Sequence, residues 1–324
     1  MTDGRPGGGP GPVRTAFLGS GAFGRASLRR LTERDDVDVV TVVTAPPRSS
    51  GRGGRPTSTE IAELATTLGL PVETPARLRD RAAIERILAD DPELIVLADY
   101  GRIVPEALLD RRFGALNLHP SLLPRHRGAT PVAAAIAAGD EATGVTLMRM
   151  DAGLDTGPIV AQVRVPLEGN ETTPSLEANL EVVAADLLDD RLGPWLRGGV
   201  TARPQSEAGA TLTRPFRRED GRVDVARSAV ELERLVRARQ PWPGTFVDTP
   251  IGRLVVWSAG TDATGGPPRG EFDAHGVGVG LGERLRLLEV QPGGGRRMTW
   301  DAFVRGRPAI VGASVEAGPG PEVR

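Results

Sequence analysis

The sequence alternates short, mostly apolar runs with longer segments of helical pattern over its first half. The runs at 13–20, 37–44 and 93–99 are rich in Val, Ile and Leu, and 22–34 and 58–69 carry apolar residues at helical spacing. Runs that are apolar along their whole length suit strands buried on both faces of a parallel sheet. The alternation therefore predicts an α/β domain with a doubly wound, mostly parallel sheet.

The second part of the chain has a different pattern. Beyond residue 207, strand candidates at 253–259, 276–282 and 284–292 are separated by Gly- and Pro-rich turns, with one helix predicted at 228–240. This pattern predicts a small C-terminal β-barrel of OB-like type. We therefore expect a disordered leader, a Rossmann-like catalytic domain, a linker, the β-barrel domain and a disordered tail, at residues 1–12, 13–200, 201–207, 208–313 and 314–324.

Composition narrows the chemistry that the chain can use. It contains no Cys and no Lys, so the 40 residues counted as Lys or Arg are all Arg, and it has only 3 His. These absences exclude disulfides, thiolate nucleophiles, a Schiff-base lysine and a P-loop, and they argue against a His-rich metal site. No stretch approaches the roughly 18 consecutive apolar residues of a membrane span. We expect a cytoplasmic enzyme.

A glycine motif lies where the first predicted strand meets the following helix. Gly19, Gly21 and Gly24 satisfy the GxGxxG spacing at a strand-to-helix turn, where the pyrophosphate of a dinucleotide would lie. The second strand ends without an acidic residue that could bind the ribose of NAD, but Arg48 could contact a 2′-phosphate. If the motif binds a dinucleotide, we therefore expect NADP rather than NAD. A tight structural turn is the interpretation that we favour.

Polar side chains mark the end of the strand predicted at 115–120. Strand alternation places Asn117 and His119 on one face, and a later Gly-containing loop offers Asp151 and Asp155. In open α/β folds, ligands bind at the carboxyl edge of the sheet. An amide donor and an imidazole can stabilise an oxyanion there, while a carboxylate orients the imidazole and accepts protons. This combination suits acyl-type transfer to an amine.

Simpler interpretations of these residues remain open. An isolated Asn-x-His pair can satisfy backbone groups at a strand end, and Asp151 and Asp155 can form Asx turns. Ser121 is a conceivable nucleophile, but its surroundings do not form a G-x-S-x-G elbow, which disfavours a covalent route. We expect His126 and His275 to be surface residues.

Five longer blocks carry a resemblance that goes beyond these patterns. The blocks are "ADYGRIVP", "GALNLHPSLLPRHRGATP", "GDEATGVTLMRMDAGLDTGPIV", "LTRPFRREDGRVD" and "RQPWPGTF", and with them nearly the whole chain resembles the methionyl-tRNA formyltransferase family. The resemblance implies transfer of the formyl group of 10-formyltetrahydrofolate to the α-amino group of methionyl initiator tRNA, without a metal. It also implies that Asn117, His119 and Asp155 are the catalytic residues.

The resemblance further implies two sets of binding residues. The folate would contact Ser121, Leu122, Leu123, Pro124, Tyr100, Gly101, Ile103, Val104 and Asp151. The tRNA would meet five arginines, Arg48, Arg52, Arg55, Arg125 and Arg127. The first three lie in "APPRSSGRGGRP", which is too polar and glycine-rich to pack as a strand or helix. We expect this segment to be a mobile loop, and arginine suits both phosphates and base edges. The resemblance implies that Arg52 is the main RNA contact, because the family places a critical arginine of its tRNA-contacting loop at this position.

Alternative functions remain open. The Asn-His-Asp set would also fit a folate-dependent formyltransferase for a small amine, such as glycinamide ribonucleotide or an amino sugar. The glycine motif would fit an NADP-dependent oxidoreductase, and a purely RNA-binding module would leave the Asn-His-Asp set unexplained. The first turn, "GSGAFG", departs from the Gly-Thr-Pro-x-Phe-Ala of the family, and lysines common near its domain junction are arginines or absent. Such changes alter the detail of RNA contacts, because Arg keeps the charge of Lys but changes the hydrogen-bond geometry.

Overall fold

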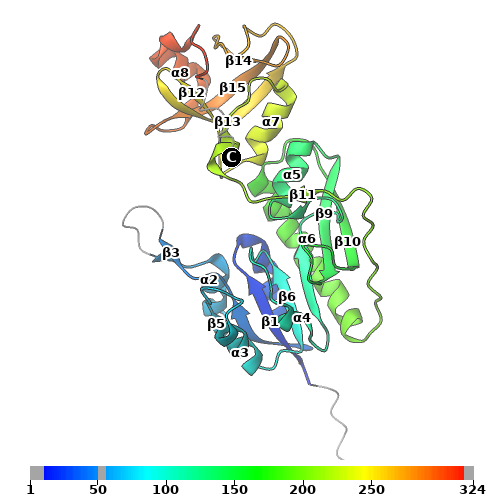
Figure 1. Cartoon of the computed structure of the whole chain (residues 1–324). Helices are drawn as coiled ribbons and strands as arrows, with labels where there is room; N and C mark the ends of the chain where they lie inside the picture. Colours follow the sequence, from blue (N-terminus) through cyan, green and yellow to red (C-terminus); the bar gives the residue numbers. More distant parts are fainter. Residues whose placement is uncertain (1–10, 50–55, 317–324) are drawn as a thin grey trace, which may run out of the picture. The chain divides into compact units, whose positions relative to one another are not determined.

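The structure is a computed structural model that describes residues 11–49 and 56–316, and the chain divides into two compact units (Figure 1). The first unit consists of Met1–Ala129, Thr143–Pro166 and Glu177–Thr213. The second consists of Thr130–Ala142, Leu167–Leu176 and Arg214–Arg324. This division differs from the predicted boundaries, because the expected linker belongs to the first unit and two internal segments belong to the second. Most of the predicted leader, residues 1–10, lies outside the described residues.

A seven-stranded sheet lies at the centre of the first unit, with the strand order β10-β9-β7-β6-β1-β2-β5. Its strands are β1 (Val13–Gly19), β2 (Val37–Val43), β5 (Val72–Glu73), β6 (Leu94–Ala98), β7 (Ala115–His119), β9 (Ala142–Arg149) and β10 (Ile159–Pro166). Neighbouring strands from β7 to β5 run parallel, whereas β9 is antiparallel to β7. The predicted α/β class with a mostly parallel sheet is confirmed.

Helices lie between and after these strands, and those at 22–32 and 60–67 match the helices predicted at 22–34 and 58–69. The helices are η1 (Ala22–Gly24), α1 (Arg25–Thr32), α2 (Glu60–Thr67), α3 (Arg81–Ala89), α4 (Glu106–Leu109) and α6 (Thr173–Leu196). Helix α2 shows why its sequence starts a helix, since the hydroxyl of Thr59 accepts the N–H of Ala62 at 3.1 Å. A Thr at this position satisfies one of the N–H groups that the first helical turn leaves unpaired.

Three parallel strands end side by side at the edge of the sheet where the predicted site residues lie. The register pairs Gly19 with Ala98 and Ala98 with Leu118, so β1, β6 and β7 finish at the same edge. Every residue of β6 and of β7 is buried. The apolar strands therefore carry the few polar side chains at their carboxyl ends into an enclosed part of the unit.

A curled antiparallel sheet forms most of the second unit, with the order β12-β13-β15-β14 and with β16 paired to β15 (Figure 1). The strands are β12 (Thr245–Thr249), β13 (Gly252–Asp262), β14 (Gly276–Val279), β15 (Glu283–Pro292) and β16 (Met298–Thr299). Its core includes Trp300, whose ring stacks on Phe272 and Phe303 with centroids 6.0 and 5.5 Å apart. The predicted C-terminal barrel is thus a half-barrel.

The helices of the second unit come from two parts of the sequence. They are α5 (Pro131–Ala138), α7 (Ala229–Ala238), α8 (Trp300–Gly306), η2 (Arg218–Gly221) and η3 (Pro308–Ile310). Helix α7 begins with a capping box in which Ser228 and Glu231 exchange side-chain and main-chain hydrogen bonds. Helix α5, which packs against α7, was not predicted from the sequence.

Two expectations about irregular segments are corrected. The sequence predicts a disordered tail from Ser314 onward, but Val315 donates its N–H to Gly270 O at 2.7 Å and Glu316 donates its N–H to Asp248 O at 2.8 Å. The loop after β2 was expected to contain no strand, yet its two ends pair as β3 (Arg48–Ser49) and β4 (Pro56–Thr57). Among the described residues, no helix is both long and apolar enough to cross a membrane.

Candidate active site

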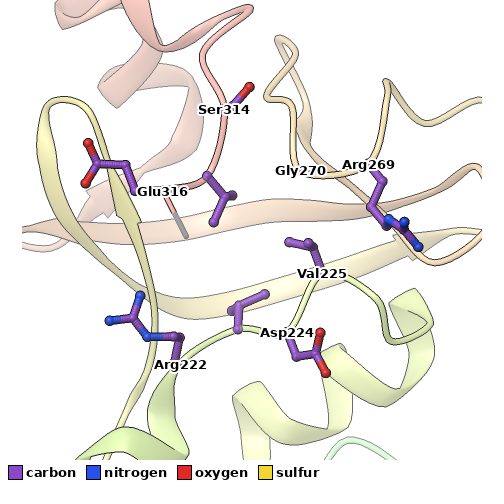
Figure 2. A pocket seen from close by; sticks show the side chains of 9 residues that line it. Arg222, Asp224, Val225, Arg269, Gly270, Ser314 and Glu316 are labelled. Atoms are coloured by element: carbon purple, nitrogen blue, oxygen red, sulfur yellow. The ribbon is translucent and has the colours of Figure 1, made fainter. Parts of the chain in front are cut away.

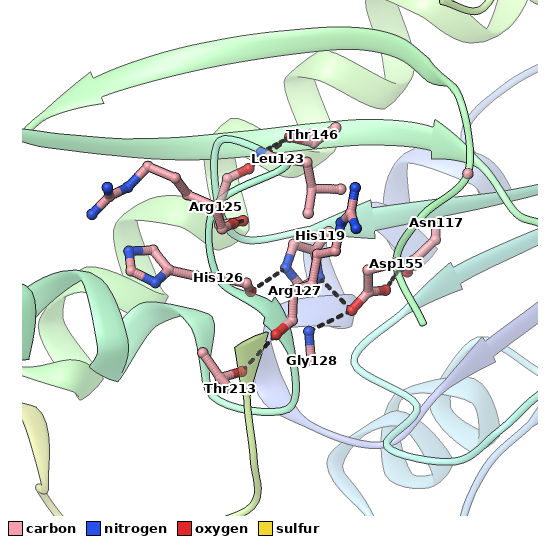
Figure 3. Close-up of polar contacts among 12 residues, drawn as sticks. Asn117, His119, Leu123, Arg125, His126, Arg127, Gly128, Thr146, Asp155 and Thr213 are labelled. Atoms are coloured by element: carbon pink, nitrogen blue, oxygen red, sulfur yellow. Dashed lines mark hydrogen bonds and ion pairs between the residues drawn. The ribbon is translucent and has the colours of Figure 1, made fainter. Parts of the chain in front are cut away.

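Asn117 and His119 lie at the carboxyl end of β7, on the same face of the strand (Figure 3). Their partners on the antiparallel strand β9 are Met148 and Thr146. Asn117 is 6% exposed and His119 is 4% exposed, so both polar side chains require partners inside the protein. The alternation along β7 thus brings an amide and an imidazole into one enclosed site, as predicted from the sequence.

Asp155, in the loop between β9 and β10, brings its carboxylate to this pair. Its Oδ2 accepts the N–H of Gly128 at 2.7 Å and lies 3.6 Å from Nδ1 of His119. Its Oδ1 accepts a long hydrogen bond, 3.4 Å, from Nδ2 of Asn117. The three predicted catalytic residues therefore form one cluster. The main-chain N–H of Gly128, which sequence reasoning did not identify, also bonds to this cluster through Asp155.

The hydrogen bonds of His119 define the protonation of its ring. Nε2 lies 3.0 Å from the main-chain carbonyl of His126, and because a carbonyl oxygen only accepts, Nε2 carries a hydrogen. In the neutral ring Nδ1 is then a lone pair that faces Asp155. Burial lowers the pKa of His119 below its ordinary value, and the carboxylate of Asp155 opposes this effect. The pair is arranged to take up one proton between Nδ1 and Oδ2.

The prediction that His126 is a surface residue is wrong. Its side chain is buried, and its backbone has a φ of 59°, in the left-handed region. Thr211 holds this conformation, because its Oγ1 accepts the N–H of His126 at 2.8 Å. The result is a carbonyl aimed at His119, a role that depends on backbone geometry and leaves no signal in the sequence.

The residues predicted to contact folate differ in exposure. Leu123 and Val104 are buried, and Tyr100 belongs to the core of the unit. Ile103, in contrast, is 89% exposed. Asp151 accepts from the N–H of Gly153 and from the hydroxyl of Thr156 within its own loop, at 3.0 and 2.8 Å. Its side chain thus forms the turn that the simpler interpretation expected.

A buried hydrogen-bond network fixes the segment from Ser121 to Pro124. The hydroxyl of Thr146 on β9 donates to Ser121 O at 2.6 Å and accepts the N–H of Leu123 at 3.2 Å. Gln162 on β10 donates to Leu123 O and to Thr146 Oγ1, both at 2.9 Å. The hydroxyl of Ser121 is itself bonded to Arg125 O at 2.7 Å, which gives it a structural partner. Sequence reasoning did not identify Thr146 or Gln162.

The predicted RNA-contacting arginines divide into three groups. Arg48 and Arg125 are exposed. Arg52 and Arg55 lie outside the described residues. Arg127 is 4% exposed, and its guanidinium donates to Gln205 and to Glu207. This position differs from the expected surface contact, because the donors of Arg127 are turned into the first unit and already have acceptors.

The glycine turn after β1 is packed against the end of β6. The N–H groups of Ser20 and Gly21 both donate to the carbonyl of Asp99, at 2.9 and 3.4 Å. A Cβ added at Gly21 would collide with the carboxylate of Asp99. In a nucleotide-binding turn these N–H groups are free for phosphate oxygens. Their use by Asp99, together with a carboxylate beside the turn, argues against the NADP hypothesis and explains why glycine is needed here.

A cavity of about 290 Å³ lies in the second unit (Figure 2). Its charged lining includes Arg222, Asp224, Arg269 and Glu316. Arg222 is ion-paired with Asp248 at 2.7 Å, so one of the two cations already has a partner. Among the described residues, none of those predicted from the sequence as site residues lines this cavity.

Comparison with known families defines the class of protein to which this fold and site belong. The family model described as "Formyl transferase" matches residues 13–192. The model described as "Formyl transferase, C-terminal domain" matches residues 215–308. The first unit, with its Asn-His-Asp cluster, and the half-barrel of the second unit are therefore those of a formyltransferase.

Individual relatives specify the branch of this class. The methionyl-tRNA formyltransferase of Roseiflexus sp. (strain RS-1) is 41% identical over 301 residues, which cover 91% of this chain and 93% of the relative. That of Methylobacterium nodulans is 39% identical over 308 residues, which cover 93% of this chain and 99% of the relative. The chain belongs to the methionyl-tRNA formyltransferase family.

Solved structures with lower identity show the same fold. HypX from Aquifex aeolicus, in complex with tetrahydrofolic acid, matches with a TM-score of 0.59 and 18% identity over 90% of this chain and 46% of that one. WlaRD, a sugar 3N-formyl transferase, matches with a TM-score of 0.61 and 15% identity over 85% of this chain and 97% of that one. At these identities the likeness concerns the fold alone.

Proposed function

We propose that the chain transfers the formyl group of 10-formyltetrahydrofolate to the α-amino group of methionyl initiator tRNA. The observation that carries the proposal is the cluster of Asn117, His119 and Asp155, in which Asn117 and His119 are buried. The methionyl-tRNA formyltransferases that match this chain do so over both of its units. The alternative, a small amine as acceptor, is supported by the sugar formyltransferase fold. It is weaker, because the matches at 41% and 39% identity extend over more than nine-tenths of the chain.

The first chemical step is the attack of the amine on the formyl carbon. As the new C–N bond forms, the carbonyl electrons move to the formyl oxygen, which becomes an oxyanion. Asn117 is placed to stabilise it, since Nδ2 makes only one long hydrogen bond, 3.4 Å, within the described residues. Its second hydrogen is the donor that we assign to the oxyanion, and a donor of this kind contributes most when charge has developed.

The second step requires the attacking nitrogen to lose a proton. The lone pair of His119 Nδ1 and the carboxylate of Asp155 receive it together, at the 3.6 Å gap between them. The imidazolium formed in this way becomes a second charge that stabilises the oxyanion. The oxyanion then re-forms the carbonyl, the bond to N10 of the folate breaks, and N10 takes up the proton that His119 and Asp155 received from the amine. The products are the formylated amine and tetrahydrofolate.

Folate and RNA contacts complete the proposal. We assign the pterin to the segment Ser121–Pro124 and to Tyr100, Gly101, Ile103, Val104 and Asp151. The 89% exposure of Ile103 supports an apolar contact that a ligand would cover. Arg48 and Arg125, both exposed, and Arg52 and Arg55 remain the proposed tRNA contacts. The cytoplasm is the compartment that we propose, as the site of translation initiation.

A direct assay tests the proposed reaction. The full chain is incubated with 10-formyltetrahydrofolate and either methionyl initiator tRNA or an amino sugar nucleotide, and release of tetrahydrofolate is followed. We expect release with the tRNA only. Release with the sugar nucleotide alone would replace the proposal by its alternative, and saturable binding of NADPH would revive the oxidoreductase hypothesis.

A second experiment tests the proposed RNA contact of Arg52. Arg52→Ala should reduce formylation of the tRNA and flatten the log-log salt dependence of RNA binding by about one unit, as expected for one lost phosphate contact. Folate binding should not change. Arg52→Lys is the matched variant, because it keeps the charge and loses the planar fork of donors. Full activity of Arg52→Ala would remove this residue from the RNA site.

A further inference from the structure

The segment from residue 201 to residue 213 crosses the candidate site within the first unit and bonds to its backbone. Leu212 and Thr213 form strand β11, which pairs in parallel with β8 (Arg127–Gly128). The hydroxyl of Thr213 donates to Arg127 O at 3.0 Å (Figure 3). The N–H of Arg127 donates to Thr211 O at 2.9 Å. The segment is therefore part of the site, although the sequence predicts a linker at 201–207 and the start of the β-barrel domain at 208.

Gln205 is the member of this segment that touches the catalytic loop. Its Nε2 donates to two main-chain carbonyls, those of Asp155 and Gly157, each at 2.8 Å. Its Oε1 accepts from Nε and Nη2 of Arg127, at 3.2 and 3.0 Å. A guanidinium only donates and a carbonyl only accepts, so the orientation of the carboxamide is fixed and all four of these bonds form together.

The backbone that Gln205 holds is in an unfavourable conformation. Asp155 has a φ of 53°, in the left-handed region that non-glycine residues rarely adopt. Such a conformation persists only where the surroundings over-determine it. The direction of the Asp155 side chain follows from this backbone. The two bonds from Gln205 thus help to set where the carboxylate lies relative to Nδ1 of His119.

Arg127 keeps Gln205 in place from the other side. Its buried guanidinium bonds to Gln205 and also to the exposed carboxylate of Glu207, through Nη1 at 3.2 Å and Nη2 at 3.1 Å. A buried guanidinium without acceptors would carry a large desolvation cost, so Arg127 requires these partners. Arg127 fixes Oε1 of the Gln205 amide. Nε2 of the same amide is thereby directed at the loop that contains Asp155.

We propose that Gln205 is a positioning residue of formyl transfer, which acts through the main chain of Asp155. It does not touch the reacting atoms, and it sets the angle and distance at which the Asp155 carboxylate meets His119. The inference rests on the proposed function, in which Asp155 and His119 share the proton of the attacking amine. Arg127, expected from the sequence to contact RNA, is in this view the support of Gln205.

The variant Gln205→Glu separates positioning from folding. It keeps the size of the side chain and an oxygen for Arg127, and the new ion pair strengthens that contact. It replaces the donating Nε2 by an oxygen that faces two carbonyl oxygens, so both bonds to the loop are lost. We expect kcat to fall about 10- to 100-fold, the size of effect that follows a displacement of about 1 Å in a catalytic group. The KM values for folate and tRNA should remain close to those of the parent, and the two proteins are compared at a temperature well below the melting temperature of either, because the lost bonds also cost stability.

Glu207→Gln is the matched control. It weakens the other partner of the same guanidinium and leaves the bonds from Gln205 to the loop intact. We expect its kcat to stay within about twofold of the parent, as for other exposed ion-pair partners. A loss in Glu207→Gln equal to that in Gln205→Glu would overturn the proposal, because the ion pair of Arg127, and not the loop contact, would then be the cause.

Two further measurements distinguish positioning from a merely structural role: the pH profile of kcat and the kcat of a double variant. The carboxylate of Asp155 raises the pKa of His119, so its displacement in Gln205→Glu should move the acid limb of the kcat profile to lower pH. Combined with Asp155→Asn, Gln205→Glu should cause little further loss, since the two residues act in series. If Asp155→Asn alone retains full turnover, the proposed function fails.

The positioning proposal alone fails in two other cases. In the first, Asp155→Asn is slow but Gln205→Glu is as fast as the parent. In the second, the kcat losses of the two single variants multiply in the double variant.

Discussion

At the scale of the residue, the site depends on two non-glycine residues with left-handed backbones, Asp155 and His126. Each such conformation costs about 1–3 kcal/mol, and both are held by nearby hydrogen bonds. One of them turns a carbonyl toward Nε2 of His119, and the other brings a carboxylate toward Nδ1. The backbone thus decides which nitrogen of the ring carries the hydrogen and which is left to receive the proton of the amine.

Asp155→Asn tests the charge of this residue without changing its shape. Asn tolerates the left-handed region as Asp does, and its side-chain oxygen can still accept the N–H of Gly128. The charge that raises the proton affinity of His119 is lost. We expect turnover to fall about 100- to 1,000-fold, the range seen when one electrostatic partner of a transition state is removed. Single-turnover rates and a folate titration measure the effect, and folate affinity should change much less.

Single residues also show how far sequence reasoning reaches. Asn117 and His119 could be placed on one face because strand alternation is a local rule. Arg127 could not be placed, because its burial depends on Gln205, which lies 78 residues later in the chain. His126 was assigned to the surface for the same kind of reason, since its anchor Thr211 is 85 residues away. Local patterns predict which way a side chain points, and distant partners decide whether it is covered.

At the scale of the element, the sequence predicts the strands of the first unit closely because they are apolar on both faces. Helix α5 was missed because Pro131–Ala138 is also apolar on nearly all sides, so it shows no helical periodicity. The available signals were at its ends, with Pro131 in the first turn and Gly139 after the last residue. The residues at the two ends of α5 therefore indicate a helix, whereas the apolar residues between them do not.

Gly139→Ala tests the end of α5. Gly139 has a φ of 69°, and an added Cβ would also collide with the guanidinium of Arg234. We expect a destabilisation of about 1–2 kcal/mol, the cost of a left-handed conformation for a residue with a Cβ. Gly306→Ala is the control, because Gly306 ends α8 with open space around it and no positive φ. Urea unfolding of the second unit should show a loss for the first variant only, and equal stability of the two variants would contradict the expectation.

Two acidic side chains of the first unit, Asp99 after β6 and Glu177 in α6, give the fold a pH dependence. Burial raises the pKa of Asp99 to about 6, with a contribution from Glu60. Burial raises that of Glu177 to about 7, with a contribution from Asp99. Because both values lie above the roughly 4 of an unfolded chain, their stabilising effect is complete below about pH 4 and is lost as the pH rises through 6 to 7.

Glu177→Gln should therefore raise the melting temperature at pH 8 more than at pH 5, since it removes the charge that appears in this interval. Both residues are exposed at the surface of the first unit, and screening by solvent limits the gain. Asp190→Asn, in the same helix, is the control and should behave alike at both pH values. A gain in Glu177→Gln that is the same at pH 5 and pH 8 would show that the ionisation of Glu177 is not coupled to folding.

At the scale of the whole molecule, the two units are interleaved along the sequence. Thr130–Ala142 and Leu167–Leu176 belong to the second unit, although the segments before and after them belong to the first. The change of pattern near residue 207 correctly predicted an α/β unit followed by an antiparallel one. It could not reveal the interleaving, because α5 joins α7 through packing between residues far apart in the sequence. No single cut of the chain separates the units.

The interleaving predicts the behaviour of shortened chains. A chain ending at residue 207 lacks Thr211, which anchors His126, and lacks β11, which pairs with β8. It also lacks α7, so the buried Val132 and Ile136 of α5 become exposed. We expect this chain to lose folate binding and to aggregate. A chain ending at residue 213 recovers the contacts of His126 but not those of α5, and should bind folate while it remains aggregation-prone.

Fluorescence titration with folate and thermal unfolding compare both shortened chains with the full one. If the shorter chain binds folate as tightly as the full chain and unfolds cooperatively, then Thr211 and β11 are dispensable for the site. If the longer one binds no better than the shorter one, the defect comes from α5 rather than from His126. The order of the three chains thus separates the two ways in which the second half of the sequence supports the first unit.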